Sequence, residues 1–391
     1  MSSRVRVLQI ITGFAVEAPL GGIERFVIEL VKAIDNESCQ PIVFGLWDWG
    51  TPYDEAWQSH LAAAGIRTFT GAPWNARSPY LAFLESMRGI RKTFNEPVDI
   101  IHSHSQFGDV AALYLRRHLH AQKLIRTVHN EREWPKQLSR RLLLTNGLFP
   151  LLYDVELGVS KKIVGNLINR PLARLLQKEP ILAHNALNAA RFEKQSTDGS
   201  IVRQELGLPN DAIVVGSIGR LTKQKGYEFL IHSFPDILKQ FPNAYLLIVG
   251  GGELKEDIRK IARKLGIDHR VRIPGPLSNI ERIYTALDIF VSSSLWEGLP
   301  TVVMEAMISQ VPVIATAVSG NTELVNHEQT GLLVPSGDSQ ALTYAVNRLL
   351  DNKPFAQQLA ITAKQFILAH FSMSVIAEQH SSLYSDLMID R

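Results

Sequence analysis

Short apolar runs alternate along the chain with longer stretches in which apolar positions recur at helical spacing. The run RVRVLQIIT at 4–12 is followed by the amphipathic segment IERFVIELVKAI at 23–34. Further apolar runs close with DIIHSH at 99–104 and with KLIRTVHN at 123–130. Strands that alternate with helices form parallel sheets covered by helices on both faces. The pattern therefore predicts an α/β fold.

The same alternation restarts in the second half of the chain. The run AIVVGSIG at 212–219 opens a second series of strands and helices, and the polar segment RFEKQSTDGS at 191–200 separates the two series. A chain of 391 residues is also too long for one compact core. We expect two Rossmann-like domains, 1–185 and 186–370, and a final amphipathic helix within 371–391 that packs back on the first domain.

The composition is that of an ordinary globular protein, with 46% hydrophobic and 20% charged residues. A formal charge of +3 is too small to indicate a nucleic-acid partner. The single cysteine, Cys39, rules out an internal disulfide framework and fits a reducing compartment. The N-terminal sequence lacks a signal-peptide pattern, and no uncharged apolar run is long enough to span a bilayer. We expect a cytoplasmic protein.

Two carboxylates follow one of the expected strands, at the edge where parallel α/β sheets bind ligands. They are Glu297 and Glu305 in SLWEGLPTVVMEAM, and most of their neighbours are apolar. Pro300 suits the first position of a helix running from Thr301, and a helix N-terminus attracts anions. Glu305 lies on the order of 7 Å along this helix, roughly the length of a diphosphate. A nucleotide sugar would contact both acids, but Glu297 could instead be solvated and Glu305 could lie on an exposed helix face.

Two cations follow the strand AIVVGSIG. Arg220 and Lys225 stand in GRLTKQKG, where Gly219 and Gly226 give the backbone freedom. Two fixed cations suit a diphosphate whose negative charge grows as it leaves. Taken alone, the same residues would also suit a solvated surface turn.

Glycines and histidines mark further strand ends. Gly21 and Gly22 precede the first helix, where the backbone can approach a ligand, although such pairs are common. His102, His104 and His129 close two strands and either hydrogen-bond sugar hydroxyls or are structural. The chain has no H-E-x-x-H pattern, no cysteine near these histidines and no Asp-x-Asp pair. We therefore expect no metal site.

In their order along the chain, the glycine pair, HSH, TVH, GRLTKQKG and EGLPTVVME resemble glycosyltransferase family 4. This is a retaining family of the GT-B fold, in which two Rossmann-like domains face an inter-domain cleft. The resemblance covers nearly the whole chain. One position departs from it: in HNALNAARF, Asn185 matches the family but Ala186 and Asn188 do not, so this loop is left outside the expected site.

The resemblance implies a role for each group of residues. Glu297 would contact the hydroxyls of the donor sugar, helped by nearby main-chain N–H groups, and Glu305 would bind the ribose. Arg220 and Lys225 would hold the diphosphate, while His129 contacts the sugar. The expected catalytic residues are Glu297, Arg220, Lys225 and His129. The expected substrate-binding residues are Gly21, Gly22, His104, Gly298, Leu299, Pro300, Thr301 and Glu305.

The implied activity is transfer of a sugar from a nucleoside diphosphate sugar, by family frequency a UDP-sugar, to an acceptor in surface polysaccharide or lipopolysaccharide biosynthesis. The acceptor would be a glycan or a polyprenyl-diphosphate-linked sugar. No cofactor is expected, because the nucleotide sugar is a substrate. A GDP-mannose-dependent mannosyltransferase and a non-catalytic nucleotide-sugar-binding subunit remain open. A dinucleotide-dependent oxidoreductase is disfavoured, because VGGGELKE lacks the third glycine of G-x-G-x-x-G.

The stereochemistry of transfer depends on the role of Glu297. A double displacement needs a carboxylate nucleophile at the anomeric carbon. Because the resemblance places Glu297 on hydroxyls, we favour front-face attack with the departing phosphate as base. Catalysis would then rest on positioning and electrostatic stabilisation.

Two features of the first domain concern the acceptor. Four tryptophans crowd into one short region, and they could stack on sugars or pack in the core; they are Trp47, Trp49, Trp57 and Trp74. Between Arg116 and Lys178, thirteen Lys and Arg stand against four Asp and Glu. There, Arg140 and Arg141 precede several leucines. Such a segment suits peripheral contact with an anionic membrane, but the leucines could equally be core and the arginines a solvated rim.

Overall fold

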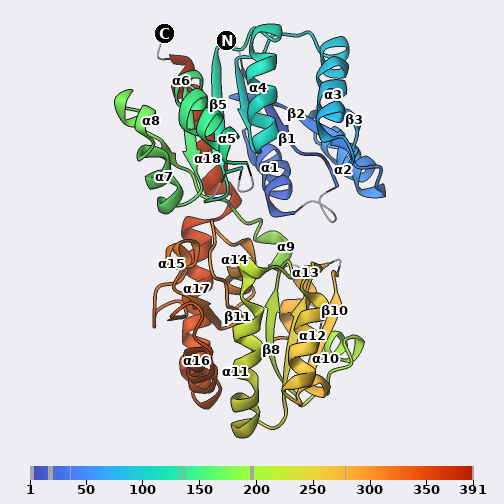
Figure 1. The fold of residues 1–391 in the computed structure, drawn as a ribbon, viewed down its shortest axis with the longest axis vertical. Coiled ribbons are helices and arrows are strands. Elements are labelled where there is room, and N and C mark those ends of the chain that lie inside the picture. The colour runs from blue at the N-terminus through green and yellow to red at the C-terminus, as the bar shows by residue number, and fades with distance from the viewer. Residues whose placement is uncertain are drawn as a thin grey trace. The chain divides into compact units, whose positions relative to one another are not determined.

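The computed structural model describes residues 4–15, 21–35, 37–131, 133–134, 137–193, 198–277 and 279–389. It divides into two compact units (Figure 1). The N-terminal unit comprises Met1–Ala186 and Met373–Arg391, and the C-terminal unit comprises Leu187–Ser372. This division falls one residue after the boundary expected from the sequence.

Among the described residues, the N-terminal unit holds a seven-stranded parallel sheet in the order β3-β2-β1-β4-β5-β6-β7. Its strands are β1 (Val5–Ile11), β2 (Cys39–Asp48), β3 (Arg67–Pro73), β4 (Ile100–Ser103), β5 (Lys123–Val128), β6 (Val155–Gly158) and β7 (Ile181–Leu182). Its helices are α1 (Gly22–Ala33), α2 (Pro52–Ala63), α3 (Pro79–Thr93), α4 (Gln106–His118), α5 (Leu138–Arg140), the π-helix η1 (Arg141–Leu148), α6 (Phe149–Leu152), α7 (Lys161–Ile168), α8 (Pro171–Leu175) and α18 (Met373–Ile389).

Alternate side chains of these strands face opposite layers of helices, as the pleat requires. Val7, Ile100 and Ile125 point to the face covered by α1 and α18, which pack on each other. Leu8 and Ile101 point to the opposite face, which is covered by α3, α4 and α6. Burial on both faces explains why these strands appear in the sequence as continuous apolar runs.

The described residues of the C-terminal unit form a six-stranded parallel sheet in the order β10-β9-β8-β11-β12-β13. Its strands are β8 (Ile213–Ile218), β9 (Ala244–Val249), β10 (Val271–Gly275), β11 (Ile289–Ser292), β12 (Val313–Thr316) and β13 (Leu332–Val334). Its helices are α9 (Ala190–Glu193), α10 (Gly199–Glu205), α11 (Tyr227–Gln240), α12 (Lys255–Lys264), α13 (Ile280–Ile283), α14 (Thr301–Ile308), α15 (Ser319–Leu324), α16 (Ser339–Asp351) and α17 (Lys353–His370). Its 3₁₀ turns are η2 (Lys223–Lys225), η3 (Asp268–Arg270) and η4 (Tyr284–Ala286).

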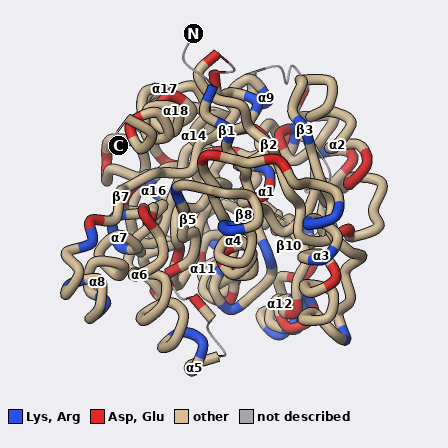
Figure 2. Tube along the Cα trace, turned by 90° about the horizontal axis from the view of Figure 1, so that it is seen from above, with Lys and Arg blue, Asp and Glu red and all other residues tan. Residues whose placement is uncertain are grey.

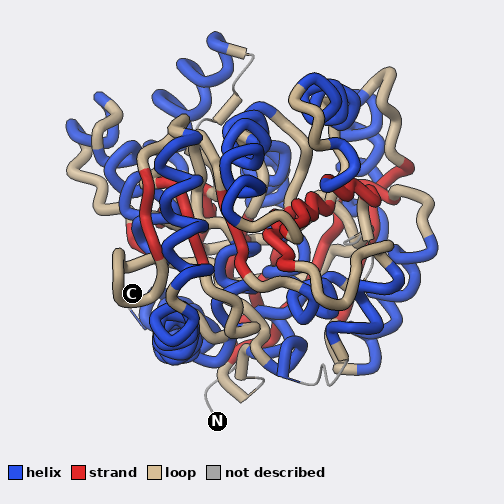
Figure 3. Tube along the Cα trace, turned by 90° about the horizontal axis from the view of Figure 1, so that it is seen from below, coloured by secondary structure: helices blue, strands red, loops and turns tan. Residues whose placement is uncertain are grey.

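Helices also cover the C-terminal sheet, and Figure 3 shows strands lying among helices. Ile248, Val291 and Ile314 pack into a core with residues of α11, α12 and α16. The helix α14 packs against β11, β12 and α17. Each unit is therefore a parallel α/β layer structure, as the alternation in the sequence predicts.

Strand order decides where each sheet offers a ligand site. β1 lies between β2 and β4, and β8 lies between β9 and β11. On either side of such a central strand the connections run in opposite directions, which leaves a crevice beyond the carboxyl ends. In the C-terminal unit this crevice separates the loop after β8 from the loop after β11.

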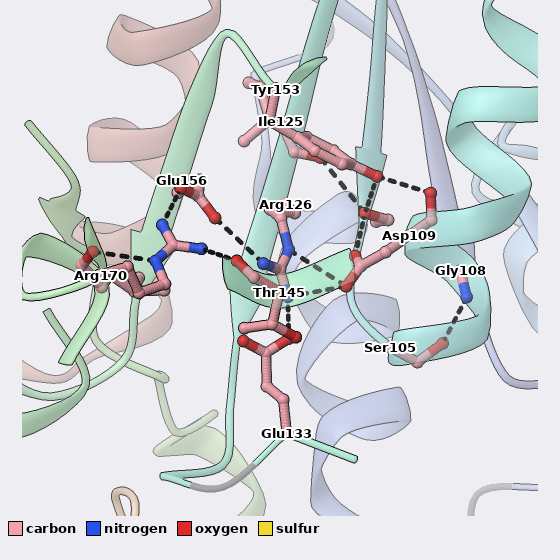
Figure 4. A network of polar contacts seen from close by, with 12 residues as sticks. Ser105, Gly108, Asp109, Ile125, Arg126, Glu133, Thr145, Tyr153, Glu156 and Arg170 are labelled. Carbon is pink, nitrogen blue, oxygen red and sulfur yellow. Dashed lines mark hydrogen bonds and ion pairs between the residues drawn. The ribbon is translucent and has the colours of Figure 1, made fainter. Parts of the chain in front are cut away.

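A buried network of charges lies on the face of the N-terminal sheet that α4 covers (Figure 4). The guanidinium of Arg126, 1% exposed, donates to Asp109 at 3.1 Å, to Glu156 at 3.0 Å and to Glu133. Arg170 also pairs with Glu156. Burial alone lowers the pKa of Arg126, but the three acids raise it above its usual value. Buried charges persist only when they are paired and hydrogen-bonded in this way.

The protonation of Asp109 should make the stability of this network depend on pH. Burial raises the pKa of the Asp109 carboxyl from its usual 3.8 to about 6, with Arg126 lowering it and Glu133 raising it. A folded-state pKa above the unfolded value means that protonation favours the folded state. The contribution of Asp109 to the free energy of unfolding is therefore full below about pH 3.8 and is lost as the pH rises through about 6.

Asp109→Asn removes this titration while keeping the size of the side chain. We expect the unfolding free energy of the wild type minus that of the variant to fall between about pH 4 and about pH 6.5. The fall should be on the order of 1–3 kcal/mol. Urea unfolding of both proteins at several pH values measures it. A difference that does not change would show that the carboxyl titrates as an ordinary aspartate, and one that rises with pH would show that its pKa is lowered in the folded state.

Candidate active site

The cationic loop of the C-terminal unit begins at the end of β8. Arg220 is exposed, and Lys225 lies at the end of η2. Gly226 adopts φ +59°, and a Cβ at this position would lie 2.3 Å from the carbonyl oxygen of Ser293. The hydroxyl of Ser293 donates to the carbonyl of Lys225 at 2.9 Å. Glycine at 226 thus lets η2 pack directly against the loop after β11.

Glu297 lies in that loop and is paired within the unit. The residue is only 5% exposed, and the ammonium of Lys225 donates to its Oε1 at 2.5 Å. Ser294 donates to the same oxygen at 2.6 Å, and Gln224 donates to Oε2 at 3.3 Å. These contacts compensate the buried carboxylate. Of the two alternatives left open by the sequence, the structure rules out a solvated Glu297.

The backbone after Glu297 is held from the far side by α15. Ser319 donates to the carbonyl of Glu297 at 3.0 Å. A Cβ at Gly320 would lie 2.3 Å from the carbonyl oxygen of Gly298, so only glycine permits this approach. Leu299 and Pro300 are buried. The main chain of this segment is therefore fixed in place, as a site that uses N–H groups requires.

Glu305 lies on α14, which begins at Thr301 with Pro300 as its N-cap rather than its first residue. The carboxylate is half-buried, and Tyr284 donates its hydroxyl to Oε2 at 2.8 Å. Burial and the adjacent Glu305 raise the pKa of Tyr284 well above its usual value, so the phenol remains a donor. The sequence had not indicated Tyr284, because it stands 21 residues away in a turn without a motif.

In the N-terminal unit, His129 follows β5 and is buried. Burial lowers its pKa to about 3, with Asn185 acting in the opposite direction and His380 adding to the decrease. The imidazole is therefore neutral at physiological pH and can donate or accept a hydrogen bond. Asn185, the one matching residue of the loop left outside the expected site, thus lies beside an expected site residue.

His104 is buried more deeply than His129 and lies against it. Its Nδ1 is 3.5 Å from Nε2 of His129, and its Nε2 is 2.8 Å from Oε1 of Gln9. Gln9 in turn donates to the hydroxyl of Tyr384 at 2.9 Å, and that hydroxyl is 2.8 Å from Nδ1 of His102. Both ring nitrogens of His104 are engaged inside the unit, which favours support of His129 over direct contact with substrate.

The remaining expected residues of this unit are less constrained. Gly21 is the N-cap of α1, and its N–H donates to Glu24 at 3.3 Å. A Cβ at Gly21 would meet no atom of the described residues within 4 Å. Gly22 is the first residue of α1. Residues 16–20, which precede the glycine pair, lie outside the described part of the chain.

Three of the four tryptophans pack together. The ring of Trp47 lies 4.6 Å from Trp74 and 6.3 Å from Trp49, and Trp47 is buried. Trp57 instead packs against the core under α1 and α18. Packing therefore accounts for Trp47, while Trp49, Trp57 and Trp74 pack against a core and remain half-buried.

No group of three or more His, Cys, Asp or Glu side chains in the described ranges could hold a metal ion. None of the helices in this part of the chain is both long and apolar enough to cross a bilayer.

Comparison with known proteins agrees with the two-unit architecture. Residues 20–166 match the family described as Glycosyltransferase Family 4, and residues 199–366 match Glycosyl transferases group 1. The solved structure of HepE from Anabaena, in complex with UDP-glucose, has a TM-score of 0.81 at 21% identity. That match covers 98% of this chain and 100% of that one.

Sequence relatives cover less of the chain. The lipopolysaccharide core biosynthesis glycosyltransferase LpsD of Rhizobium meliloti is 31% identical over 195 residues, 50% of this chain and 56% of LpsD. An Escherichia coli UDP-Gal:alpha-D-GlcNAc-diphosphoundecaprenol alpha-1,3-galactosyltransferase is 27% identical over 210 residues, 53% of this chain and 54% of that enzyme. The chain thus spans about half the length of these relatives.

The family matches lie one in each unit, in the order expected of a single member, and both sheets are parallel. The expectation from the sequence motifs is confirmed: the chain belongs to glycosyltransferase family 4 and has the GT-B fold.

Proposed function

We propose that this protein is a retaining, metal-independent glycosyltransferase that moves a sugar from a UDP-sugar to a glycan or lipid-linked acceptor in surface polysaccharide biosynthesis. The observation that carries the proposal is the pairing of Glu297 with Lys225 at the β8–β11 switch point, next to Arg220. The complex of HepE with UDP-glucose and the printed roles of the bacterial relatives support the donor and acceptor classes.

In this proposal the C-terminal unit binds the nucleotide sugar. The ammonium of Lys225 has three donors and uses one of them on Glu297, so it can also donate to a phosphate oxygen. Arg220 presents a planar guanidinium to the other phosphate oxygens. Both cations would stabilise the charge that develops on the departing diphosphate.

The two acids would bind hydroxyl groups at opposite ends of the donor. Glu297 is held by Lys225 and Ser294, and its carboxylate accepts from the sugar hydroxyls. Glu305, oriented by Tyr284, accepts from the ribose hydroxyls. The main chain of Gly298 and Leu299 and the first turn of α14 at Thr301 would complete the phosphate and sugar contacts.

Transfer would proceed by front-face attack. Glu297 is engaged with a cation and a hydroxyl, which suits a binding role rather than a covalent one. The departing phosphate then takes the proton of the acceptor hydroxyl. On the acceptor side, the N-terminal unit would supply the neutral imidazole of His129, supported by His104, and the glycine pair Gly21–Gly22.

Peripheral contact with a membrane is the second part of the proposal. In the segment from α5 to α6, Leu142 and Leu143 are 55% and 71% exposed, while Phe149 is buried. The guanidinium of Arg140 lies 4.7 Å from the centre of the Tyr80 ring, so this arginine contacts an aromatic side chain and is not simply solvated. Figure 2 shows acidic and basic positions interspersed, with basic residues at α5. The exposed leucines, rather than the arginines, are the better candidates for insertion.

A donor panel tests the proposed reaction. We expect hydrolysis or transfer of a UDP-sugar in excess EDTA, because the two cations replace a metal at the diphosphate, and NMR of the product should show the anomeric configuration of the donor retained. Turnover of GDP-mannose alone would instead identify a mannosyltransferase. Nucleotide binding with no turnover of any donor would identify a non-catalytic subunit, and activity restored only by magnesium or manganese would contradict metal independence.

Variants of Glu297 and of Tyr284, which donates to Glu305, should separate catalysis from nucleotide binding. Glu297→Gln should lower kcat by on the order of 100-fold or more, the range for loss of one electrostatic contact at a transition state. Its affinity for UDP should change little. Tyr284→Phe should weaken UDP binding by about tenfold, because Glu305 loses a donor. Calorimetry with UDP is the measurement, and Tyr344→Phe, at an exposed tyrosine, is the matched control. Wild-type affinity in Tyr284→Phe would show that Tyr284 does not support the proposed ribose contact of Glu305.

Vesicle sedimentation tests the membrane contact. The double variant Leu142→Ser, Leu143→Ser should lose most of the binding to anionic vesicles at low salt, because it removes the exposed apolar surface. Ile201→Ser removes an exposed apolar residue from the C-terminal unit and should bind as the wild type does. If the wild-type protein fails to sediment with anionic vesicles, or sediments equally with neutral ones, a soluble acceptor becomes the better account.

A further inference from the structure

A cavity of about 130 Å³ lies in the N-terminal unit beside the carboxyl end of β5. It is lined by residues from the end of β5, from the π-helix η1 and from α7. Val128 and Leu167 are buried and form part of its apolar lining, while Asn130 and Asn166 are exposed at its mouth. For scale, an engineered protein cavity of roughly 150 Å³ holds benzene, so this one takes part of a sugar ring and leaves the rest at its open mouth.

Thr145 supplies the observation that indicates a ligand. The residue lines the cavity, is 6% exposed, and its hydroxyl has no hydrogen-bond partner within the described ranges. Its carbonyl, by contrast, accepts from Arg170 at 2.7 Å. A buried hydroxyl without a partner costs on the order of 1–3 kcal/mol, so native structures seldom retain one without a reason.

The π-helix explains how one short segment serves two surfaces. Arg141, Thr145 and Asn146 all line the cavity, and their spacing suits the wider turn of a π-helix. Leu142 and Leu143, between them, are exposed. Isolated π-helical turns occur frequently at functional sites because they redirect side chains in this way.

Among the described residues, the charges that line the cavity are balanced. Glu133 and Arg170 line it, and both belong to the buried network around Arg126 (Figure 4). Arg170 is engaged with Glu156 and Glu133 with Arg126, so neither charge calls for a counter-ion from a ligand. Arg141 and Glu131 add one charge of each sign. Amides, a hydroxyl and a small apolar surface favour an uncharged ligand with several hydroxyl groups over a phosphate.

We propose that this cavity binds one monosaccharide unit of the acceptor. The inference rests on the proposed glycosyltransferase function, because it assigns the ligand to the acceptor of that reaction. His129 follows β5 and its ring lies 6.2 Å from that of Phe26 in α1, whereas Val128 lines the cavity with residues of η1 and α7. The cavity therefore holds a sugar unit other than the one that receives the transferred sugar, and it selects acceptors by a unit remote from the new bond.

Binding of simple glycosides to the full chain tests the cavity without requiring turnover. The probes are the methyl glycosides of glucose, galactose, mannose and N-acetylglucosamine, measured by saturation-transfer NMR and titration. We expect at least one to bind. Thr145→Val should weaken this binding by about threefold to tenfold, as loss of one hydrogen bond implies, and Thr145→Ser should restore it. Thr145→Val should also be at least as stable as the wild type, because the hydroxyl it removes is unpaired in the protein.

A second pair of variants tests the cavity without altering the buried core. Asn166→Trp, at the mouth, should abolish glycoside binding, whereas Lys162→Trp, on an exposed position of the same helix that does not line the cavity, should leave it unchanged. UDP affinity measured on the same samples reports separately on the proposed donor site. If no glycoside binds, or if Asn166→Trp binds as the wild type does, the cavity is not a sugar site. Failure of the wild type to bind UDP would instead contradict the proposed function and leave the glycoside result standing.

Discussion

Parallel pairing of strands is the constraint on which both units depend. It gathers the carboxyl ends of all strands at one edge of each sheet, and it requires helices on both faces. In the C-terminal unit the loop after β8 and the loop after β11 thereby meet, and Lys225 reaches Glu297 although 72 residues separate them. In the N-terminal unit the same geometry places His104 and His129 together at the ends of neighbouring strands.

The sequence predicts features that repeat with a short period, and it fails where partners come from distant elements. Continuous apolar runs identified β8 and β11, and the loop residues after them identified Arg220, Lys225 and Glu297. Tyr284 could not be found in this way, because it reaches Glu305 from a separate turn and has no local pattern of its own. The π-helix was also missed, since a single widened turn leaves almost the same hydrophobic spacing as an α-helix.

Buried polar groups serve different purposes on the two faces of the N-terminal sheet. On one face, burial keeps His102, His104 and His129 uncharged by lowering their pKa values. On the other, Arg126 stays charged because three acids surround it. The sheet thus separates a row of neutral, hydrogen-bonded side chains from an ionic cluster. The polar groups on each face find their partners on that same face. The basic stretch from Arg116 to Lys178, for which the sequence leaves membrane contact and a solvated rim equally open, contains residues of both the neutral row and the ionic cluster.

The last helix has a consequence for how the chain matures on the ribosome. Tyr384 and Ile376 of α18 are core residues of the N-terminal unit, whereas the C-terminal unit is one uninterrupted segment, Leu187–Ser372. At roughly 5–20 residues per second, synthesis of that segment takes on the order of ten to forty seconds. Throughout that interval the first 186 residues lack one wall of their core. The part of the protein made first is therefore the part completed last, and its unfinished apolar face is what a chaperone would meet.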